Sequence, residues 1–325
     1  MNIAPEYIDW IKVLINKNES CVFNGGMSTG YFPLTRGSRQ GDPISAYLFI
    51  IVMEVFFTMV RNNNNIQGLD ILGFNYLLSA YADDATYIIK NTSSAIEIFY
   101  TFDKFSEFSG LRLNRSKCEF AGIGVKKGVQ TALLDIKNIN LMENFIRILG
   151  VHFSYNDIIY KEKIFLEVIA KMENLLAIWR WRNLSVADKI SVFKSLAFLQ
   201  NIFISYLSYI PPAIVNKLEN LQKDFIWNGK TPKVKHTTLI SNYEDGGLKD
   251  IDIMAKIKSL HLSWIKRLYS PNFHPWKNIP LKLIERYYQQ NIFYSNIKIN
   301  LPSLFPKFYI NIMNSWSDLS QQRNR

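Results

Sequence analysis

The spacing of the apolar residues changes near residue 158, and this change limits the possible folds more than any other feature of the sequence. Before it, segments of strand-like and helix-like spacing alternate, separated by turn-forming residues. After it, apolar side chains recur at helical spacing over four turns, at Phe165, Val168, Ile169, Met172, Leu175, Leu176 and Trp179. The pattern predicts an α+β domain, whose antiparallel sheet is covered by helices on one face, followed by a mostly α-helical domain.

The individual elements can be placed from their start and stop signals. In the first domain we expect helices over 1–20, 44–60 and 93–109, hairpins over 21–35 and 77–90, and strands over 111–121 and 146–154. In the second domain we expect helices from 158 onward, and then over 185–209, 212–227 and 251–269. Gly110 suits the end of the helix before it, and Ser185 with Asp188 three residues later forms a capping-box pattern.

The apolar helix expected over 44–60 is not expected to cross a membrane. It is shorter than the roughly 20 apolar residues that a span needs, and Glu54 lies near its middle. We therefore predict a buried helix. No basic residue precedes an apolar run at the N-terminus, so no signal peptide is expected and the protein is predicted to be intracellular, in the cytoplasm or the nucleus.

The charge of the chain is concentrated in its second half. Of the 325 residues 48% are hydrophobic, which excludes a disordered chain, and the formal net charge is +11. Residues 1–150 hold 14 basic and 14 acidic side chains, residues 151–270 hold 17 and 11, and residues 271–325 hold 7 and 2. A polyanionic partner, either nucleic acid or anionic lipid, is therefore expected for the second half. Two cysteines, Cys21 and Cys118, are too few for a disulfide framework or a zinc site.

A pair of carboxylates, Asp83 and Asp84, lies between two apolar segments within Leu77–Lys90. Neighbouring residues in a regular strand point to opposite faces, but at a hairpin turn both carboxylates can serve one site. Carboxylates without His or Cys suit Mg²⁺ better than zinc. The alternative is a solvated Asp-Asp turn without function.

A polar loop, T-R-G-S-R-Q-G-D-P-I-S, precedes the apolar helix. Arg36 and Arg39 offer forked donors for phosphates, and Gln40 offers an amide for a base or ribose edge. Gly37 and Gly41 let the backbone approach a ligand closely or adopt positive φ. The alternative is an ordinary Gly-Pro turn with solvated arginines.

Together, the motif R-G-S-R-Q-G-D-P-I-S, the apolar helix and Y-A-D-D resemble reverse transcriptases, and more narrowly those of LINE-type (non-long-terminal-repeat) retrotransposons. Further segments are similar in the same order, over about residues 3–270. They are G-L-R-L-N-R-S-K-C-E-F (110–120), I-L-G-V-H-F (148–153), W-R-W-R-N-L-S-V-A-D-K-I (179–190), F-I-W-N-G-K (225–230) and Y-E-D-G-G-L-K (243–249). Group II intron maturases share the palm motifs, but the W-N-G and G-G-L segments favour the LINE-type family.

The resemblance implies an RNA-directed DNA polymerase that adds dNTPs to a DNA primer on an RNA template by two-metal phosphoryl transfer. Its catalytic residues here would be Asp83 and Asp84, as ligands of Mg²⁺, and Lys117, which would neutralise or protonate the leaving pyrophosphate. The dNTP and template would be bound by Arg36, Arg39, Gln40 and Gly41, and the primer would be gripped at Leu149 and Gly150. The implied domains are a partial fingers and palm over 1–155, a helical thumb and connection over 156–270, and a basic, aromatic extension over 271–325.

One motif of the family is missing. Its first catalytic Asp lies on an earlier palm strand, whereas the early acids here are Glu6, Asp9 and Glu19, and none lies in a matching segment. We therefore expect that the chain begins downstream of that strand, that its two-metal site is incomplete, and that it polymerises weakly or not at all alone. The alternative function is a catalytically incomplete nucleic-acid-binding relic of such an element. A basic helical scaffold without a nucleic-acid role would leave the pairing of the two motifs unexplained.

The alternation of aromatic and cationic residues from Trp179 to Arg182 adds a possible nucleic-acid contact. Such side chains can stack on bases and contact phosphates, although Trp179 lies at helical spacing and could equally belong to the core. Lys230, Lys233 and Lys235 form a second candidate phosphate-contacting segment. The four histidines have no metal-like spacing, and no role is assigned to them.

Overall fold

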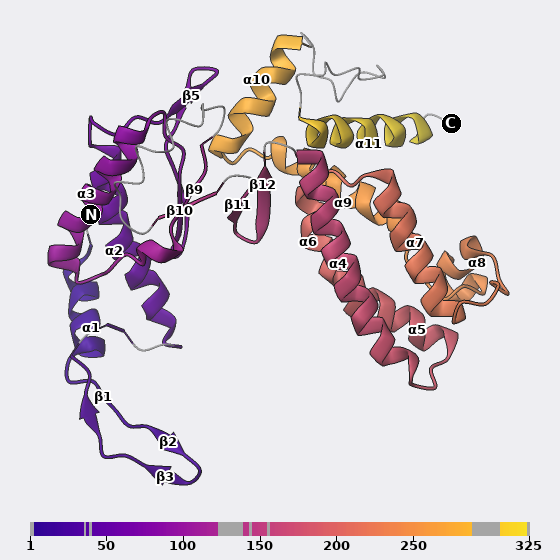
Figure 1. Cartoon of the computed structure of the whole chain (residues 1–325), viewed down its shortest axis with the longest axis horizontal. Coiled ribbons are helices and arrows are strands. Elements are labelled where there is room, and N and C mark those ends of the chain that lie inside the picture. Colours follow the sequence, from indigo (N-terminus) through magenta and orange to yellow (C-terminus); the bar gives the residue numbers. More distant parts are fainter. Residues whose placement is uncertain are drawn as a thin grey trace. The chain divides into compact units, whose positions relative to one another are not determined.

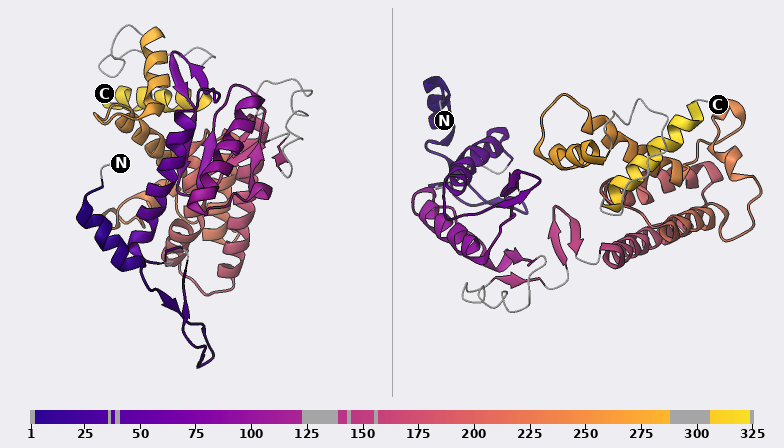
Figure 2. Two further views of the ribbon diagram at one scale, coloured as in Figure 1. Left: turned by 90° about the vertical axis from the view of Figure 1, so that its left-hand side faces the viewer. Right: turned by 90° about the horizontal axis from the view of Figure 1, so that it is seen from above.

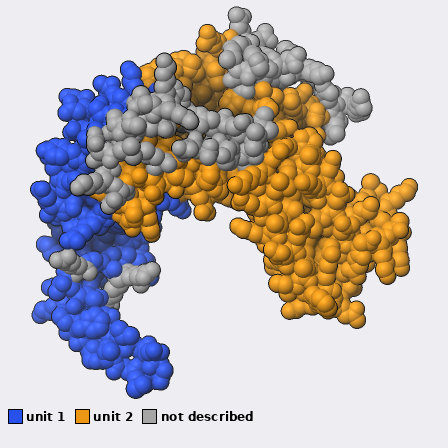
Figure 3. All heavy atoms as spheres, viewed as in Figure 1, with its two compact units in different colours: residues 1–69, 77–113 blue, residues 70–76, 114–325 orange. Residues whose placement is uncertain are grey.

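The structure is a computed structural model of the chain (Figure 1), and it describes residues 3–35, 37–38, 41–122, 139–142, 145–154, 157–287 and 306–323. The chain forms two compact units, shown in different colours in Figure 3. Unit 1 comprises residues 1–69 and 77–113, and unit 2 comprises residues 70–76 and 114–325. The functional domains predicted above, with limits at 155 and 270, are a separate division of the chain and stay a prediction.

The first part of the chain alternates short strands with three long helices, as the sequence predicted, but of the strand expected over 111–121 only Glu119–Phe120 forms. Its elements are α1 (Pro5–Ile15), β1 (Glu19–Ser20), β2 (Phe23–Asn24), β3 (Met27–Ser28), β4 (Phe32–Pro33), α2 (Pro43–Arg61), β5 (Leu69–Ile71), β6 (Phe74–Tyr76), β7 (Leu78–Tyr81), β8 (Asp84–Tyr87) and α3 (Thr92–Ser109). They are followed by a 3₁₀ turn, η1 (Arg115–Lys117), and the strands β9 (Glu119–Phe120), β10 (Asn140–Leu141), β11 (Phe145–Ile148) and β12 (Val151–Ser154).

Helices α2 and α3 pack together and form the core of unit 1. Their contact is an aromatic cluster in which the ring of Phe56 lies 5.0 Å from that of Phe102 and 5.3 Å from that of Phe105, between centroids. The Asn91 side chain caps the start of α3 by accepting a hydrogen bond from the Ser94 amide, and Gly110 ends the helix at a φ of +69°. The predicted helix and its glycine end are confirmed.

Helix α2 is less buried than the sequence predicted. Met53, Phe56, Phe57 and Val60 face the core, whereas Tyr47 and Ile50 are 65% and 56% exposed. The helix is long and apolar enough to cross a membrane, and the bent pair Val186–Ala197 and Leu199–Leu207 passes the same test together. A core helix of a soluble protein can also meet such a criterion, and Glu54 pairs with Arg61 on α2.

The α+β class is confirmed, but the strands do not form one sheet within the described residues. Each strand pairs with a single partner, in the two-stranded ladders β1–β4, β2–β3, β5–β6, β7–β8, β9–β10 and β11–β12. Several of these pairs are closed by tight turns, and β9–β10 is parallel. The sequence shows that a strand will form, but the pairing partner depends on contacts that a local pattern does not contain.

Unit 2 is dominated by helices that lie side by side (Figure 2). They are α4 (Asp157–Arg180), α5 (Val186–Val192), a π-helical segment η4 (Phe193–Ala197), α6 (Leu199–Leu207), α7 (Pro212–Trp227), α8 (His236–Ile240), the 3₁₀ turn η5 (Tyr243–Asp245), α9 (Ile253–Leu268), the 3₁₀ turn η6 (Pro275–Lys277), α10 (Asn278–Tyr287) and α11 (Lys307–Arg323). Their largest buried cluster includes Phe165, Met172, Phe193, Leu218 and Phe225.

The single helix predicted over 185–209 is broken. The capping box of Ser185 and Asp188 begins it as predicted, but the Phe198 amide donates to the Phe193 carbonyl at 2.8 Å, one residue farther than in an α-helix. The helix bends by 48° at this point. A π segment is a known cause of sharp bends, and the apolar spacing alone gives no signal for it.

The C-terminal extension, for which no element was predicted, contains α11, which packs on α9. His261 on α9 joins them: its Nε2 lies 2.8 Å from the Ser205 carbonyl, and its Nδ1 lies 3.1 Å from Nδ2 of Asn311. A carbonyl only accepts, so Nε2 carries the proton and Nδ1 accepts from the amide. His261 is fully buried, and desolvation lowers its pKa. This histidine therefore has a structural role.

Candidate functional site

The acidic motif lies at the tip of the β7–β8 hairpin in unit 1. Tyr81 pairs with Asp84 across the antiparallel ladder, so Ala82 and Asp83 form the two-residue turn. Ala82 adopts a φ of +50°, a left-handed conformation that disfavours residues with a Cβ. The predicted strand–turn–strand is confirmed.

The base of this hairpin is fixed to the α2–α3 core. Leu78, Ala85, Tyr87 and Ile89 pack against the cluster that contains Phe56 and Phe102. The tip, by contrast, is exposed, as are both Asp83 and Asp84. The hairpin thus holds two adjacent carboxylates at a defined place on the surface.

Neither carboxylate of this pair makes a contact that would stabilise the described part of the fold. No side-chain hydrogen bond or ion pair involves Asp83 or Asp84 among the described residues. Their oxygens are the ligands that hard cations such as Mg²⁺ prefer. Within the described ranges, however, no group of three His, Cys, Asp or Glu side chains could hold a metal ion. The donor type fits Mg²⁺, but the two carboxylates alone make an incomplete site.

The polar loop before α2 is only partly described. Arg36, Arg39 and Gln40 lie outside the described residues, so their proposed roles stay predictions. Gly41 has a φ of +91°, as a residue of a tight turn that only glycine adopts easily. Asp42 then caps α2, because its side chain accepts a hydrogen bond from the Ile44 amide at 3.1 Å.

The other predicted site residues belong to unit 2. Lys117 ends η1, is exposed and makes no side-chain contact with another described residue through a hydrogen bond or ion pair. Leu149 and Gly150 form the two-residue turn between β11 and β12, at φ values of +48° and +82°. A leucine at positive φ is unusual, and Leu149 is also 48% exposed.

The aromatic and cationic residues after α4 separate into two environments. Trp179 packs against the helical core, and the Arg182 guanidinium lies 4.5 Å from its ring centroid. Trp181 is 91% exposed. The first tryptophan is therefore half-buried against the core, and the second is a surface aromatic side chain.

The motif F-I-W-N-G-K ends helix α7. Asn228 and Gly229 both have positive φ, of +52° and +72°, which stops the helix. Lys189 on α5 is buried and donates from Nζ to Oδ1 of Asn228 at 2.7 Å and to the Ile226 carbonyl at 3.3 Å. Burial lowers the pKa of Lys189, and nearby Arg180 lowers it further. This part of the family motif therefore joins two helices.

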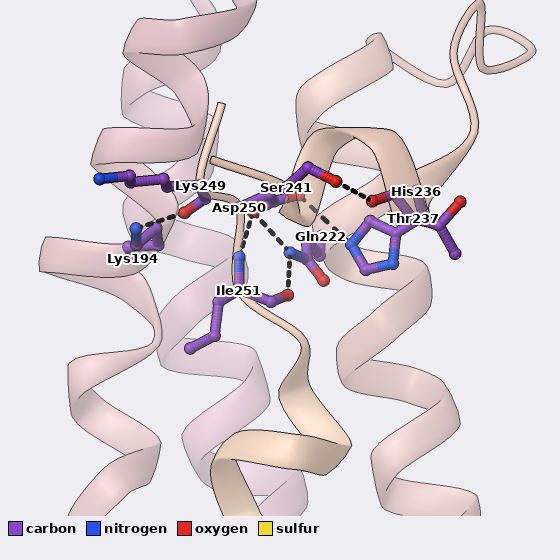
Figure 4. Close-up of polar contacts among 8 residues, drawn as sticks. All are labelled: Lys194, Gln222, His236, Thr237, Ser241, Lys249, Asp250 and Ile251. Atoms are coloured by element: carbon purple, nitrogen blue, oxygen red, sulfur yellow. Dashed lines mark hydrogen bonds and ion pairs between the residues drawn. The ribbon is translucent and has the colours of Figure 1, made fainter. Parts of the chain in front are cut away.

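A polar cluster around Asp250 was missed by sequence reasoning (Figure 4). The Asp250 side chain is fully buried, and its Oδ1 accepts hydrogen bonds from Nε2 of Gln222 at 2.9 Å and from the Ile251 amide at 2.7 Å. Its Oδ2 lies 3.3 Å from Nε2 of His236. Gln222 and His236 come from different segments, α7 and α8, and no local pattern signals their meeting with Asp250.

The glycine pair of Y-E-D-G-G-L-K positions this cluster. Gly246 has a φ of +76° and ends η5. A Cβ on Gly247 would lie 2.0 Å from the Ser241 carbonyl oxygen, so only glycine fits there. The chain then returns to α8, where the Leu239 carbonyl accepts from the amides of Leu248 and Asp250.

Comparison with known proteins agrees with the motifs. Residues 1–153 match the family model described as reverse transcriptase (RNA-dependent DNA polymerase). Over 99% of its length the chain is 23% identical to the protein named "Transposon TX1 uncharacterized 149 kDa protein" from Xenopus laevis, of which it covers 25%. Over 37% of its length it is 28% identical to the "Retrovirus-related Pol polyprotein from type-2 retrotransposable element R2DM" from Drosophila melanogaster, of which it covers 11%.

The chain thus spans a quarter or less of these relatives. The match of residues 1–153 contains the acidic hairpin and the polar loop before α2, and the longer of the two similarities continues through unit 2. Residues 1–153 thus match the reverse transcriptase family, and the two similarities support a relation of the chain to proteins of non-long-terminal-repeat retrotransposons.

Proposed function

We propose that this chain carries part of the nucleotidyl-transfer site of an RNA-directed DNA polymerase, centred on the tip of the β7–β8 hairpin. The observation that supports this best is the pair Asp83 and Asp84, exposed on a fixed hairpin and used by no other described side chain. The substrates would be an RNA template, a DNA primer and dNTPs.

In this reaction, the primer 3′-hydroxyl attacks the α-phosphate of the dNTP. A new O–P bond forms, the bond between the α- and β-phosphates breaks, the hydroxyl proton is released and pyrophosphate leaves. Bound Mg²⁺ ions would stabilise the charge on the attacking and leaving oxygens. Asp83 would be the main carboxylate ligand, with Asp84 auxiliary, and the cationic Lys117 would neutralise or protonate the pyrophosphate.

The remaining site residues would bind and orient the substrates. Gly41, with its positive φ, would help shape the dNTP and template site together with Arg36, Arg39 and Gln40. The turn of Leu149 and Gly150 would contact the primer backbone. These roles rest on the motifs and stay proposals.

A second candidate function follows from the small number of carboxylates near the tip of the β7–β8 hairpin. Two-metal transfer needs ligands beyond one aspartate pair, and the described residues do not supply a third. We propose that this chain alone polymerises weakly or not at all, and that it binds nucleic acid without incorporation until another carboxylate completes the site.

Primer extension separates these functions. The chain and its Asp83→Asn variant are assayed with a DNA primer annealed to an RNA template, dNTPs and Mg²⁺, and duplex binding is measured in parallel. Salt-sensitive binding with little extension is the expected result. Robust extension that Asp83→Asn abolishes would show that the chain has a complete site, and extension unaffected by that substitution would refute the role of the hairpin.

A further inference from the structure

Unit 2 contains a pocket that no part of the proposed polymerase site uses. It has a volume of about 620 Å³ and lies between the second half of α7, the segment 232–235 and the start of α8. This volume is in the range of cavities that hold small ligands, and it exceeds what single water molecules would fill. The polar cluster around Asp250, shown in Figure 4, adjoins the pocket through Gln222 and His236, which also line it.

Three lysines give the pocket its cationic character. Lys223, Lys233 and Lys235 line it, and none of them makes a side-chain hydrogen bond or ion pair within the described part of the chain. Two carboxylates, Glu219 and Asp252, also line it, so cations outnumber anions by three to two, and Asp252 caps α9, where its Oδ1 accepts from the Ala255 amide at 2.8 Å. Exposed ammonium groups without a partner favour an anionic ligand.

The pocket also offers an aromatic wall. Trp227 lines it together with Pro232, and the tryptophan is half-buried. The indole packs against the cluster of Ile190, Ile226 and Leu239, which fixes its position. A fixed indole beside cations is suited to stacking with a planar group that is attached to an anion.

We propose that this pocket binds one nucleotide of a single-stranded nucleic acid. The phosphodiester contacts the lysines, and the base lies against Trp227. A single strand fits better than a duplex, because the bases of a duplex are already stacked and cannot enter a side pocket. RNA and DNA share this chemistry. This inference rests on the proposed function in one respect, because the choice of nucleic acid as the ligand comes from it.

The test measures binding of fluorescent hexauridylate and hexathymidylate to the full chain by anisotropy. The variant Lys233→Gln/Lys235→Gln removes two pocket cations, and Lys171→Gln/Lys266→Gln is the matched control, because these lysines are exposed on helices and do not line the pocket. We expect the pocket variant to bind about tenfold more weakly and the slope of log affinity against log salt to fall by about 1.4, from two lost phosphate contacts. The control should change neither.

A local readout uses photo-crosslinking with oligonucleotides that contain 4-thiouridine or 4-thiothymidine, mapped by mass spectrometry. We expect crosslinked residues to lie in the segment from Trp227 to His236. The oligonucleotide that gives the higher crosslinking yield shows whether RNA or DNA is preferred. Equal weakening in both double variants, adducts only elsewhere, or equally tight binding of a hexaglutamate peptide would overturn the proposal. Primer extension is measured separately. Crosslinks in the pocket without primer extension would support the nucleotide-binding pocket but not the proposed polymerase site. Primer extension without crosslinks in the pocket would support the polymerase site but not the pocket.

Discussion

Substituting Gly247 by alanine tests whether the G-G-L motif is required by packing. A Cβ at this position would lie 2.0 Å from the Ser241 carbonyl oxygen and 2.7 Å from the Thr238 carbonyl oxygen, whereas such contacts are essentially never shorter than 3.0 Å. Both neighbours are backbone atoms, so no side chain can rotate away. The segment would have to move by about 1 Å, and closely packed interiors resist a shift of that size.

The magnitude follows from the hydrogen bonds that the shift would stretch. The amides of Leu248 and Asp250 donate to the Leu239 carbonyl at 3.0 and 2.9 Å, and the Lys249 amide donates to the Ser241 carbonyl at 3.0 Å. Each lost bond costs about 1 kcal/mol, and each buried group left unpaired costs about 1–3 kcal/mol. At about 2 kcal/mol for each bond lost with a buried group left unpaired, losing two predicts a decrease of about 4 kcal/mol in the free energy of unfolding, a large part of the roughly 5–15 kcal/mol of a typical domain.

Gly246→Ala is the matched control. Nothing lies within 4 Å of its added Cβ, and only its φ of +76° opposes the substitution, which predicts a loss of about 1 kcal/mol. Urea unfolding followed by far-UV circular dichroism measures both variants. If Gly247→Ala does not fold well enough for this, limited proteolysis near residues 241–250 should still show it opened more than Gly246→Ala. A loss no greater than that of Gly246→Ala would refute the close approach.

Three further predictions concern the folded state. Burial lowers the pKa of His261, so on acidification the unfolded chain takes up a proton at this residue before the folded chain does. The contribution of His261 to the free energy of unfolding is complete above about pH 6.5 and decreases below it, by up to about 1.4 kcal/mol per pH unit. His261→Gln should reduce this pH dependence, measured by urea unfolding between pH 5 and 8. Leu149→Gly should raise the free energy of unfolding by about 1 kcal/mol, because glycine accepts the φ of +48°; a decrease in thermal stability would contradict this. Phe105→Ala should lower it by about 3–5 kcal/mol, because Phe105 is 1% exposed and contacts three other rings; a loss below 1 kcal/mol in urea unfolding would contradict this.

The features predicted correctly from the sequence are those with local signals. The end of α3 at Gly110, the capping box at Ser185 and the turn at Asp83 each depend on a few neighbouring residues. The features missed depend on contacts between distant segments. The π segment before Phe198 is an example, because its apolar spacing looks like that of an ordinary helix.

The same distinction applies to the candidate sites. The acidic turn was predicted because its residue types suit metal binding, whereas the Asp250 cluster brings in Gln222 and His236 from separate segments. His236 lacks metal-like spacing to the other histidines, so the sequence predicts no role for it. Its contact with a buried carboxylate arises from the fold alone.

The structure also shows that two of the motifs, G-G-L and Y-A-D-D, differ in their effect on stability, a difference that sequence similarity does not show. The G-G-L motif is fully accounted for by packing, since Gly246 supplies a positive φ and Gly247 makes room for a carbonyl. The Y-A-D-D turn works against stability: Ala82 at a φ of +50° costs about 1–2 kcal/mol, and two like charges lie side by side without a described partner. A Gly at 82 and a neutral residue at 84 would make a more stable hairpin. Folding alone therefore does not explain this turn, which agrees with the proposed role of its carboxylates in metal binding.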